Sequence, residues 1–188
     1  CSKDIVNKYI NDENEFEIRN IDDSIFKLPK QPYKKKISKT KKKSNRVCAI
    51  KYNKKTKKKV SKTYKNKKSA KKNNALITHI GECGACSTIK DLGVYMKYFD
   101  ITDEVRKCAL KGIISKKNSI ECLKELGFTD KCAHIWYYNT VNTRKNCFLK
   151  CIIRLLSPHN NKDGSMNKCI ECDEYKSGPI FQKYAGTY

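Results

Sequence analysis

Cysteine is the residue type that most constrains how this chain can fold. The 188 residues include eleven cysteines, and nine of them lie between Cys83 and Cys172. Such a density indicates either a disulfide framework formed in an oxidising compartment or metal sites in a reducing one. The apolar pattern around the cysteines bears on that choice.

Apolar residues recur at helical spacing in five short segments of residues 75–188. A cysteine falls in or beside each apolar stripe, where side chains face the core. The same stripes place Ile113, Phe148 and Ile152 inward. Ser87 or Thr88, Thr102 and Thr129 are the predicted N-caps of three helices, and two more helices are predicted to begin at Ser119 and at about Thr143. A last helical turn surrounds 169–175 until Ser177-Gly178-Pro179 breaks it.

We therefore predict a mainly α fold, a small disulfide-stapled bundle of about five short helices at residues 75–188. About four or five disulfides would hold it, each stabilising the fold by roughly 2–4 kcal/mol. Cys147 and Cys151 lie one helical turn apart, and we expect each to bond to a different neighbouring helix. The predicted participants are Cys48, Cys83, Cys86, Cys108, Cys122, Cys132, Cys147, Cys151, Cys169 and Cys172.

Cys1 is the one cysteine that is not among the predicted participants in these disulfides. Because eleven is odd, at least one thiol is free or bonds outside the chain, and Cys1 is the candidate for an intermolecular disulfide. A chain that begins at Cys1 rather than Met is expected to have lost an upstream segment, and a lipidated Cys1 is the alternative. No window approaches 18 uninterrupted apolar residues, so we predict no membrane span.

Charge divides the chain into three segments. Residues 1–26 form an acidic and apolar N-terminal segment with three basic and seven acidic residues. Residues 27–74 form a lysine-rich basic arm with 22 basic residues and no acid, whereas residues 75–188 carry 17 basic and 12 acidic residues. Almost all of the net charge of +23 therefore lies in the arm, which indicates a polyanionic partner or a solvated, disordered tail.

Two β-prone runs within the arm predict a hairpin over residues 47–64. Strand alternation places Cys48, Ile50 and Tyr52 on one face. Because a lone hairpin is marginally stable in water, we expect it to dock on the Cys-rich part, with a Cys48 disulfide as one means. Residues 75–80 are predicted to be a short strand or an extended lead-in.

The lysines of the arm are the predicted polyanion-binding residues. Clustered lysine binds nucleic acid or sulfated glycan strongly but without regard to sequence, and Tyr33, Tyr52 and Tyr64 are placed to stack on bases. Arg46 is the only arginine of the arm, which argues against specific base readout. The predicted contacts are Lys34, Lys35, Lys36, Lys41, Lys42, Lys43, Lys57, Lys58, Lys59, Lys67 and Lys68.

Two Cys-x-x-Cys pairs offer alternative functions. Cys83 and Cys86 precede a predicted helix start, which lowers thiol pKa values and suits a thiol–disulfide oxidoreductase. No alternating βαβ pattern surrounds them, and Glu82 disfavours a thiolate. Together with Cys169 and Cys172 they would form a zinc-binding module, but the pairs lie much farther apart than in compact zinc sites. Structural disulfides are the favoured reading of both pairs.

A set of short motifs from His79 onward carries the pattern CGxCST…CxxCDE…SGP, and they lie at residues 81–88, 91–95, 122–129, 132–139, 169–174 and 177–179. In these motifs the sequence resembles an uncharacterised Cys-rich, secreted-type family of oomycetes and algae. It implies an oxidising setting and a disulfide-dependent fold, and it supplies no catalytic assignment. The basic arm lies outside the pattern, and its Lys/Asn-rich composition resembles a member encoded by a large DNA virus of protists.

The sequence thus predicts a non-enzymatic, disulfide-stabilised structural or binding protein. No phosphate loop, HExxH, GxSxG or paired-carboxylate signature is present, and His79, His134 and His159 match no ligand spacing. No cofactor or metal is expected. The expected partners are nucleic acid or another polyanion, or other virion proteins, and the expected location is a virion or the extracellular space.

Overall fold

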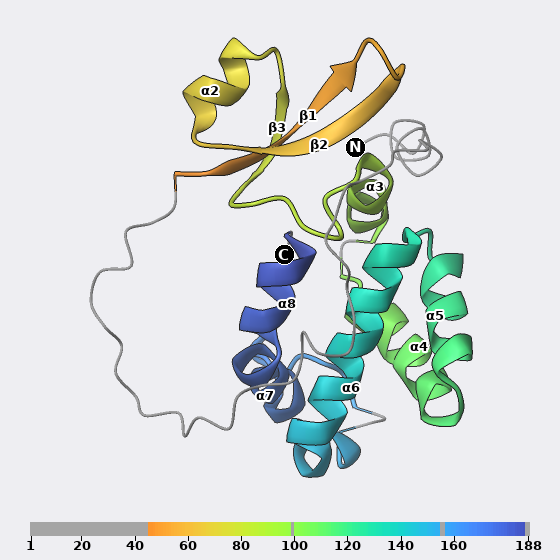
Figure 1. Cartoon of the computed structure of the whole chain (residues 1–188). Coiled ribbons are helices and arrows are strands. Elements are labelled where there is room, and N and C mark those ends of the chain that lie inside the picture. Colours follow the sequence, from red (N-terminus) through yellow and green to blue (C-terminus); the bar gives the residue numbers. More distant parts are fainter. Residues whose placement is uncertain (1–44, 99, 155–156, 187–188) are drawn as a thin grey trace.

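The computed structural model describes residues 45–98, 100–154 and 157–186. In this part of the chain a three-stranded antiparallel sheet with one short helix lies at one end, and six helices form the rest (Figure 1). The mainly α prediction is therefore confirmed, with a larger sheet than expected. The elements are β1 Val47–Asn53, β2 Lys58–Tyr64, α2 Lys67–Lys72, β3 Leu76–Ile80, α3 Ile89–Lys97, α4 Thr102–Ile114, α5 Lys116–Glu125, α6 Asp130–Ile152, α7 Lys168–Lys176 and α8 Gly178–Ala185.

The predicted hairpin exists as β1 and β2, and β3 pairs with the other edge of β1 to give the order β2-β1-β3. The sheet thus includes residues on both sides of the boundary placed at residue 74. One face carries a small core of Val47, Ala49 and Tyr64, which Ala70 of α2 and Ala75 complete. This small core explains why the short, lysine-rich α2 forms, although the sequence did not predict it.

The opposite face of the sheet meets the loop that leads to α3. Cys48 forms a disulfide with Cys83, which is one of the predicted ways for the hairpin to dock on the Cys-rich part. The Ser61 hydroxyl donates to the carbonyl of Ser87 at 2.7 Å, and the amide of Cys83 donates to the Thr63 hydroxyl at 2.9 Å. These contacts reach only the near half of the hairpin, so Tyr52 farther along the same face is 52% exposed.

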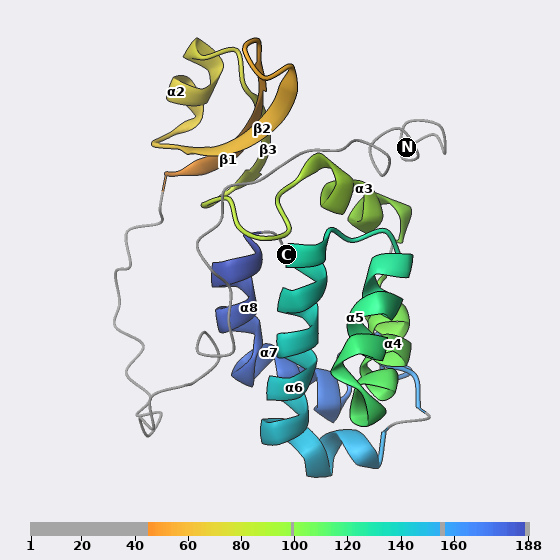
Figure 2. The same ribbon diagram turned by 45° about the vertical axis from the view of Figure 1, so that its right-hand side comes forward.

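The helical body is built around α6, which runs between the α4–α5 hairpin and the α7–α8 pair (Figure 2). Its core contains Leu123, Phe128, Ile135 and Phe181, each exposed by 2% or less. The Trp136 ring lies 4.4 Å from the Phe181 ring, centroid to centroid. These large side chains, contributed by three helices and a loop, join the two helical pairs through α6.

The termini of this body close on each other. The amides of Ala85 and Cys86 donate to the carbonyls of Tyr184 and Ala185 at 2.8 and 2.9 Å. A Cβ atom on Gly84 would lie 2.4 Å from the Ala185 carbonyl carbon, so only glycine permits this approach. The Gly84 position between two cysteines is therefore a packing requirement.

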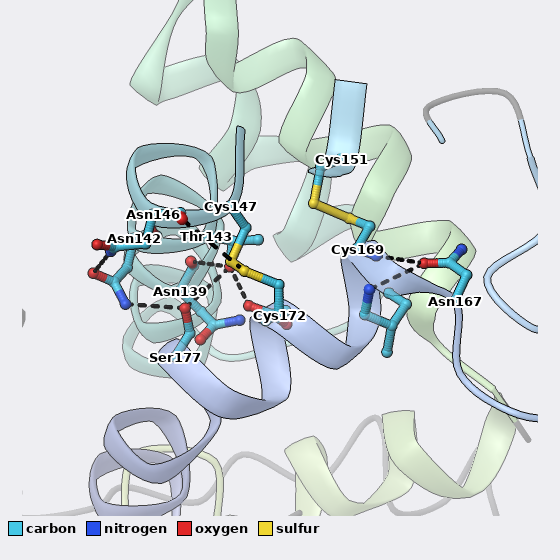
Figure 3. The surroundings of a disulfide bond; sticks show 12 residues. Asn139, Asn142, Thr143, Asn146, Cys147, Cys151, Asn167, Cys169, Cys172 and Ser177 are labelled. Carbon is cyan, nitrogen blue, oxygen red and sulfur yellow. Dashed lines mark hydrogen bonds between the residues drawn. A yellow bond between two sulfur atoms is a disulfide. The ribbon is translucent and has the colours of Figure 1, made fainter. Parts of the chain in front are cut away.

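Five disulfides pair the ten cysteines from Cys48 to Cys172. Cys86–Cys132 ties the segment before α3 to α6, and Cys108–Cys122 ties α4 to α5. Cys147–Cys172 and Cys151–Cys169 both join α6 to α7 (Figure 3). The expectation that Cys147 and Cys151 bond to different helices is wrong, because Cys169 and Cys172 also lie one turn apart and α7 presents both to the same face of α6.

Helix α6 is one continuous helix of 23 residues where two were predicted. The prediction began a new helix at about Thr143, and residues 139–143 are indeed types with low helix propensity. Packing overrides that propensity: Tyr138, Asn139 and Asn142 are buried, and the Asn142 amide donates to the Ser177 hydroxyl at 2.9 Å (Figure 3). Tertiary hydrogen bonds thus hold the segment helical.

Three other boundaries differ from the prediction. Helix α5 begins at Lys116 with Ser115 as its N-cap, so Ser119 is a buried interior residue rather than the start. Thr102 is the first residue of α4 rather than its predicted N-cap, and its amide donates to the Asp100 carboxylate. The Ser177-Gly178-Pro179 sequence ends α7 but also starts α8, because proline is well tolerated in a first helical turn.

The inward positions predicted for Ile113, Phe148 and Ile152 are wrong. These side chains are 64%, 51% and 50% exposed. They lie on stripes that the neighbouring helices cover only in part. Among the described helices, none has both the length and the apolar content needed to cross a bilayer.

Candidate functional site

The candidate site is a lysine surface on the sheet end of the molecule. We define the lysine surface as the twelve lysines of residues 45–74, a stretch that carries no acidic residue. Eleven of them are exposed, and Lys59 is half-buried. Its members are Lys51, Lys54, Lys55, Lys57, Lys58, Lys59, Lys62, Lys65, Lys67, Lys68, Lys71 and Lys72.

A defined turn presents the lysines at the tip of the hairpin. The Asn53 side chain accepts a hydrogen bond from the amide of Lys55 at 3.0 Å, which fixes the start of the turn. Lys57 adopts a positive φ of 54°, the conformation that lets the chain enter β2. The tip lysines are therefore carried by ordered backbone.

The strand register places a second group of lysines on the face of the sheet against which α2 packs. Residues directly opposite on paired strands share a face, and Lys62 lies opposite Ala49 while Lys58 lies opposite Asn53. Lys51 shares this face because it alternates with Ala49 and Asn53. Lys59 lies on the other face, opposite Tyr52.

Helix α2 supplies the third group beside the same face. Asn66 caps it by accepting from the amide of Ser69 at 2.8 Å. Lys71 and Lys72 occupy its last turn, where the negative end of the helix favours cations. Only Ala70 of this helix is buried, so its lysines point away from the small core.

Of the predicted contact residues, Lys57, Lys58, Lys59, Lys67 and Lys68 come together in this unit. Lys34, Lys35, Lys36, Lys41, Lys42 and Lys43 lie outside the described residues, as do Cys1 and Tyr33. Arg46 pairs with Glu82 of the following loop. Tyr64 is buried in the sheet core, and burial raises the pKa of its hydroxyl, so Tyr52 is the exposed ring of the hairpin.

The two Cys-x-x-Cys pairs have structural partners. A redox-active pair requires Cys83 and Cys86 to bond to each other, whereas Cys83 bonds to Cys48 and Cys86 bonds to Cys132. Cys169 and Cys172 are likewise held in the disulfides to α6, so their sulfurs are not thiolate ligands. Within the described ranges, no group of three or more His, Cys, Asp or Glu residues is arranged to hold a metal ion.

A buried carboxylate that the sequence analysis did not single out lies at the start of α3. Asp91 of α3 is fully buried and accepts hydrogen bonds from the Thr88 hydroxyl at 2.5 Å and from the amide and hydroxyl of Thr129 at 2.7 and 2.8 Å. Burial raises the pKa of Asp91 to about 6, although these hydrogen bonds and Lys90 lower it. Because Thr88 and Thr129 cap α3 and α6, Asp91 joins the starts of two helices.

Comparisons with known proteins concern the helical body. A family model described as a family of unknown function (DUF8771) matches residues 116–188. That range contains both α6–α7 disulfides entirely, together with Cys122 and Cys132 of two others, and it excludes the lysine surface. No curated protein and no solved structure matches the chain.

Proposed function

We propose that this is a non-enzymatic binding protein that holds polyanions through its lysine surface. Five intramolecular disulfides indicate a disulfide-stabilised protein of an oxidising, extracellular type of environment. A virion or secreted location, and an origin in a large DNA virus of protists, belong to the proposal and rest on the resemblance.

The observation that carries the proposal is the concentration of twelve lysines and no acid on one small folded unit. A disordered tail needs no defined turn, cap or register, yet part of the arm has all three. Lysines on the edge strand β2 also prevent unwanted pairing of strands, but α2 lies outside the strands and carries lysines as well. Lysine rather than arginine favours contact with phosphate or sulfate without base readout.

The test is binding of heparin and of duplex DNA as a function of salt. We expect heparin to retain the protein at about 150 mM salt, and the logarithm of the DNA affinity to fall linearly with the logarithm of salt concentration, by about 0.9 for each phosphate contact. Elution below that salt concentration would reject the proposal.

A matched pair of triple variants locates the contact surface. Lys51→Gln, Lys54→Gln and Lys62→Gln together remove three charges from the lysine surface. Lys111→Gln, Lys145→Gln and Lys162→Gln remove three exposed charges from the helical body. The first variant should flatten the salt dependence by up to about 2.7, and the second should leave it unchanged. Equal losses would show that net charge, and not this surface, determines binding.

A further inference from the structure

The helical body has a groove that the lysine surface does not involve. The groove has a volume of about 260 Å³ and lies between α4, α6, α7 and α8. Its walls are mostly apolar and include Val105, Leu110, Trp136, Phe148 and Phe181. Pockets of this kind, with few polar groups among apolar ones, are the usual sites for small molecules.

Part of the exposed apolar surface of the body lies at this groove, whereas Ile114, Leu149 and Ile153 lie outside it. Ile113 of α4 and Phe148 and Ile152 of α6 all line it, and each exposes half or more of its side chain. These are the residues whose helical spacing predicts a covered position. Apolar side chains grouped around a concavity, unlike isolated ones, mark a surface that binds something apolar.

The cationic side chains that line the groove are all arginines, although lysine is far more common than arginine in this chain. The sequence has 37 lysines and five arginines. Three of the five, Arg106, Arg144 and Arg154, line the groove, and no lysine does. A guanidinium group forms paired, planar hydrogen bonds with a carboxylate or a phosphate, which an ammonium group cannot do.

Two of these arginines form no ion pair within the part of the chain that the structure describes. Arg106 is anchored by a hydrogen bond to the carbonyl of Ser157 at 2.9 Å and lies 3.6 Å from Asp103. Arg144 and Arg154, among the residues that the structure describes, have no carboxylate within 4 Å of their guanidinium groups. An anion entering the groove would therefore displace no ion pair of theirs.

Two carboxylates also line the groove, and one of them serves the fold. Asp173 of α7 accepts hydrogen bonds from Thr143, Ser177 and Asn139 and so ties α7 to α6. Glu174 accepts no hydrogen bond from the side chains of the described residues, and burial followed by the nearby charge of Asp173 raises its pKa. The groove is thus lined by three arginines and two carboxylates. Hydrogen bonds to α6 and Ser177 hold Asp173 in place, whereas Glu174 is not held in this way.

We propose that this groove binds an amphiphilic anion, a single hydrocarbon chain that ends in a carboxylate. The apolar walls would take the chain, and Arg144 and Arg154 would hold the carboxylate. The proposal is independent of polyanion binding at the lysine surface, because a hydrocarbon chain contributes nothing there.

Trp136 provides a local readout. It is the only tryptophan of the chain, and it lines the groove. Titration with octanoate, decanoate and dodecanoate should change its fluorescence in a saturable way. Each added methylene should tighten binding about four-fold until the groove is full, from the transfer free energy of a CH₂ group. Dodecanol and dodecyltrimethylammonium should bind at least ten-fold more weakly than dodecanoate.

A matched pair of variants tests the role of arginine. Arg144→Gln should weaken dodecanoate binding about ten-fold, whereas Lys145→Gln, the same loss of charge on the next and exposed residue of α6, should leave it unchanged. Glu174→Gln should tighten binding, because it removes a like charge. Melting temperatures equal to that of the original protein would show that the variants fold.

Three results would overturn the proposal. One is a fluorescence response that does not depend on chain length, which would assign anion binding to surface charge. Another is equal weakening by Arg144→Gln and Lys145→Gln. The third is tighter binding of the cationic amphiphile than of dodecanoate, which would assign the groove to cations through Glu174.

Discussion

The sheet and the helical body are stabilised in opposite ways. The sheet has a core of small and medium residues, and a single disulfide ties it to the body. Its lysine surface carries positive charge alone. The body has four disulfides of its own, a larger aromatic core and charges of both signs, many of them in exposed pairs along its helices. Repulsion between like charges lowers the stability of the sheet. We therefore infer that the stability of the sheet depends on its attachment to the helical body.

The largest expected effect comes from removing the disulfide that closes the longest loop. Cys86–Cys132 encloses a sequence separation of 46, and the chain-entropy estimate gives about 4 kcal/mol for it. Replacement of both cysteines by alanine should lower the unfolding free energy of the whole body by at least that amount, because both are completely buried. Denaturant unfolding of the variant measures the loss.

The Cys48→Ala and Cys83→Ala pair sharpens the comparison. We expect it to speed amide hydrogen exchange in β1 and β2 while exchange in α6 stays slow, because it frees the sheet alone. If exchange in α6 accelerates as much as in β1, the sheet and the body unfold as one unit, and the contrast between them is wrong.

The second largest expected effect is the pH dependence of stability that Asp91 of the helical body causes. The pKa of Asp91 is about 6 in the fold and near 3.8 when unfolded, so the fold binds this proton more tightly. Stability from this group is complete below pH 4 and is lost as the pH rises to 6, about 3 kcal/mol in all. The difference in unfolding free energy between the original protein and Asp91→Asn should fall by this amount between about pH 3 and pH 7.

Glu125→Gln is the control for that measurement, because it also removes one carboxylate and Glu125 is exposed at the end of α5. Parallel curves for Asp91→Asn and Glu125→Gln would contradict the raised pKa of Asp91.

The smallest expected effect is that of salt on the sheet. Screening by 0.5 M salt reduces repulsion among the lysines, so amide exchange in β2 should slow by a few-fold, whereas exchange in α5 should not. Sulfate and chloride at equal ionic strength separate screening from specific anion binding. An equal response of both elements would mean that repulsion does not distinguish the two regions.

Local patterns predicted most of the elements, whereas α2, α8 and the continuity of α6 depend on long-range contacts. The alternation in the hairpin and the Thr88 and Thr129 caps depend on neighbouring residues, so the sequence shows them directly. The continuity of α6 depends on hydrogen bonds to Ser177 and Asp173, more than 25 residues away. The groove was missed for the same reason, because no spacing reveals that α4 and α7 leave Phe148 uncovered.

The arrangement of the disulfides has a mechanical consequence. Cys48–Cys83, Cys86–Cys132 and Cys147–Cys172 close three loops that follow one another along the chain without overlapping. A force that pulls on both ends would pass from sulfur to sulfur across each loop and would not extend the residues inside it. More than half of the chain is thus shielded from stretching, and under tension only the short connections and the terminal segments would lengthen.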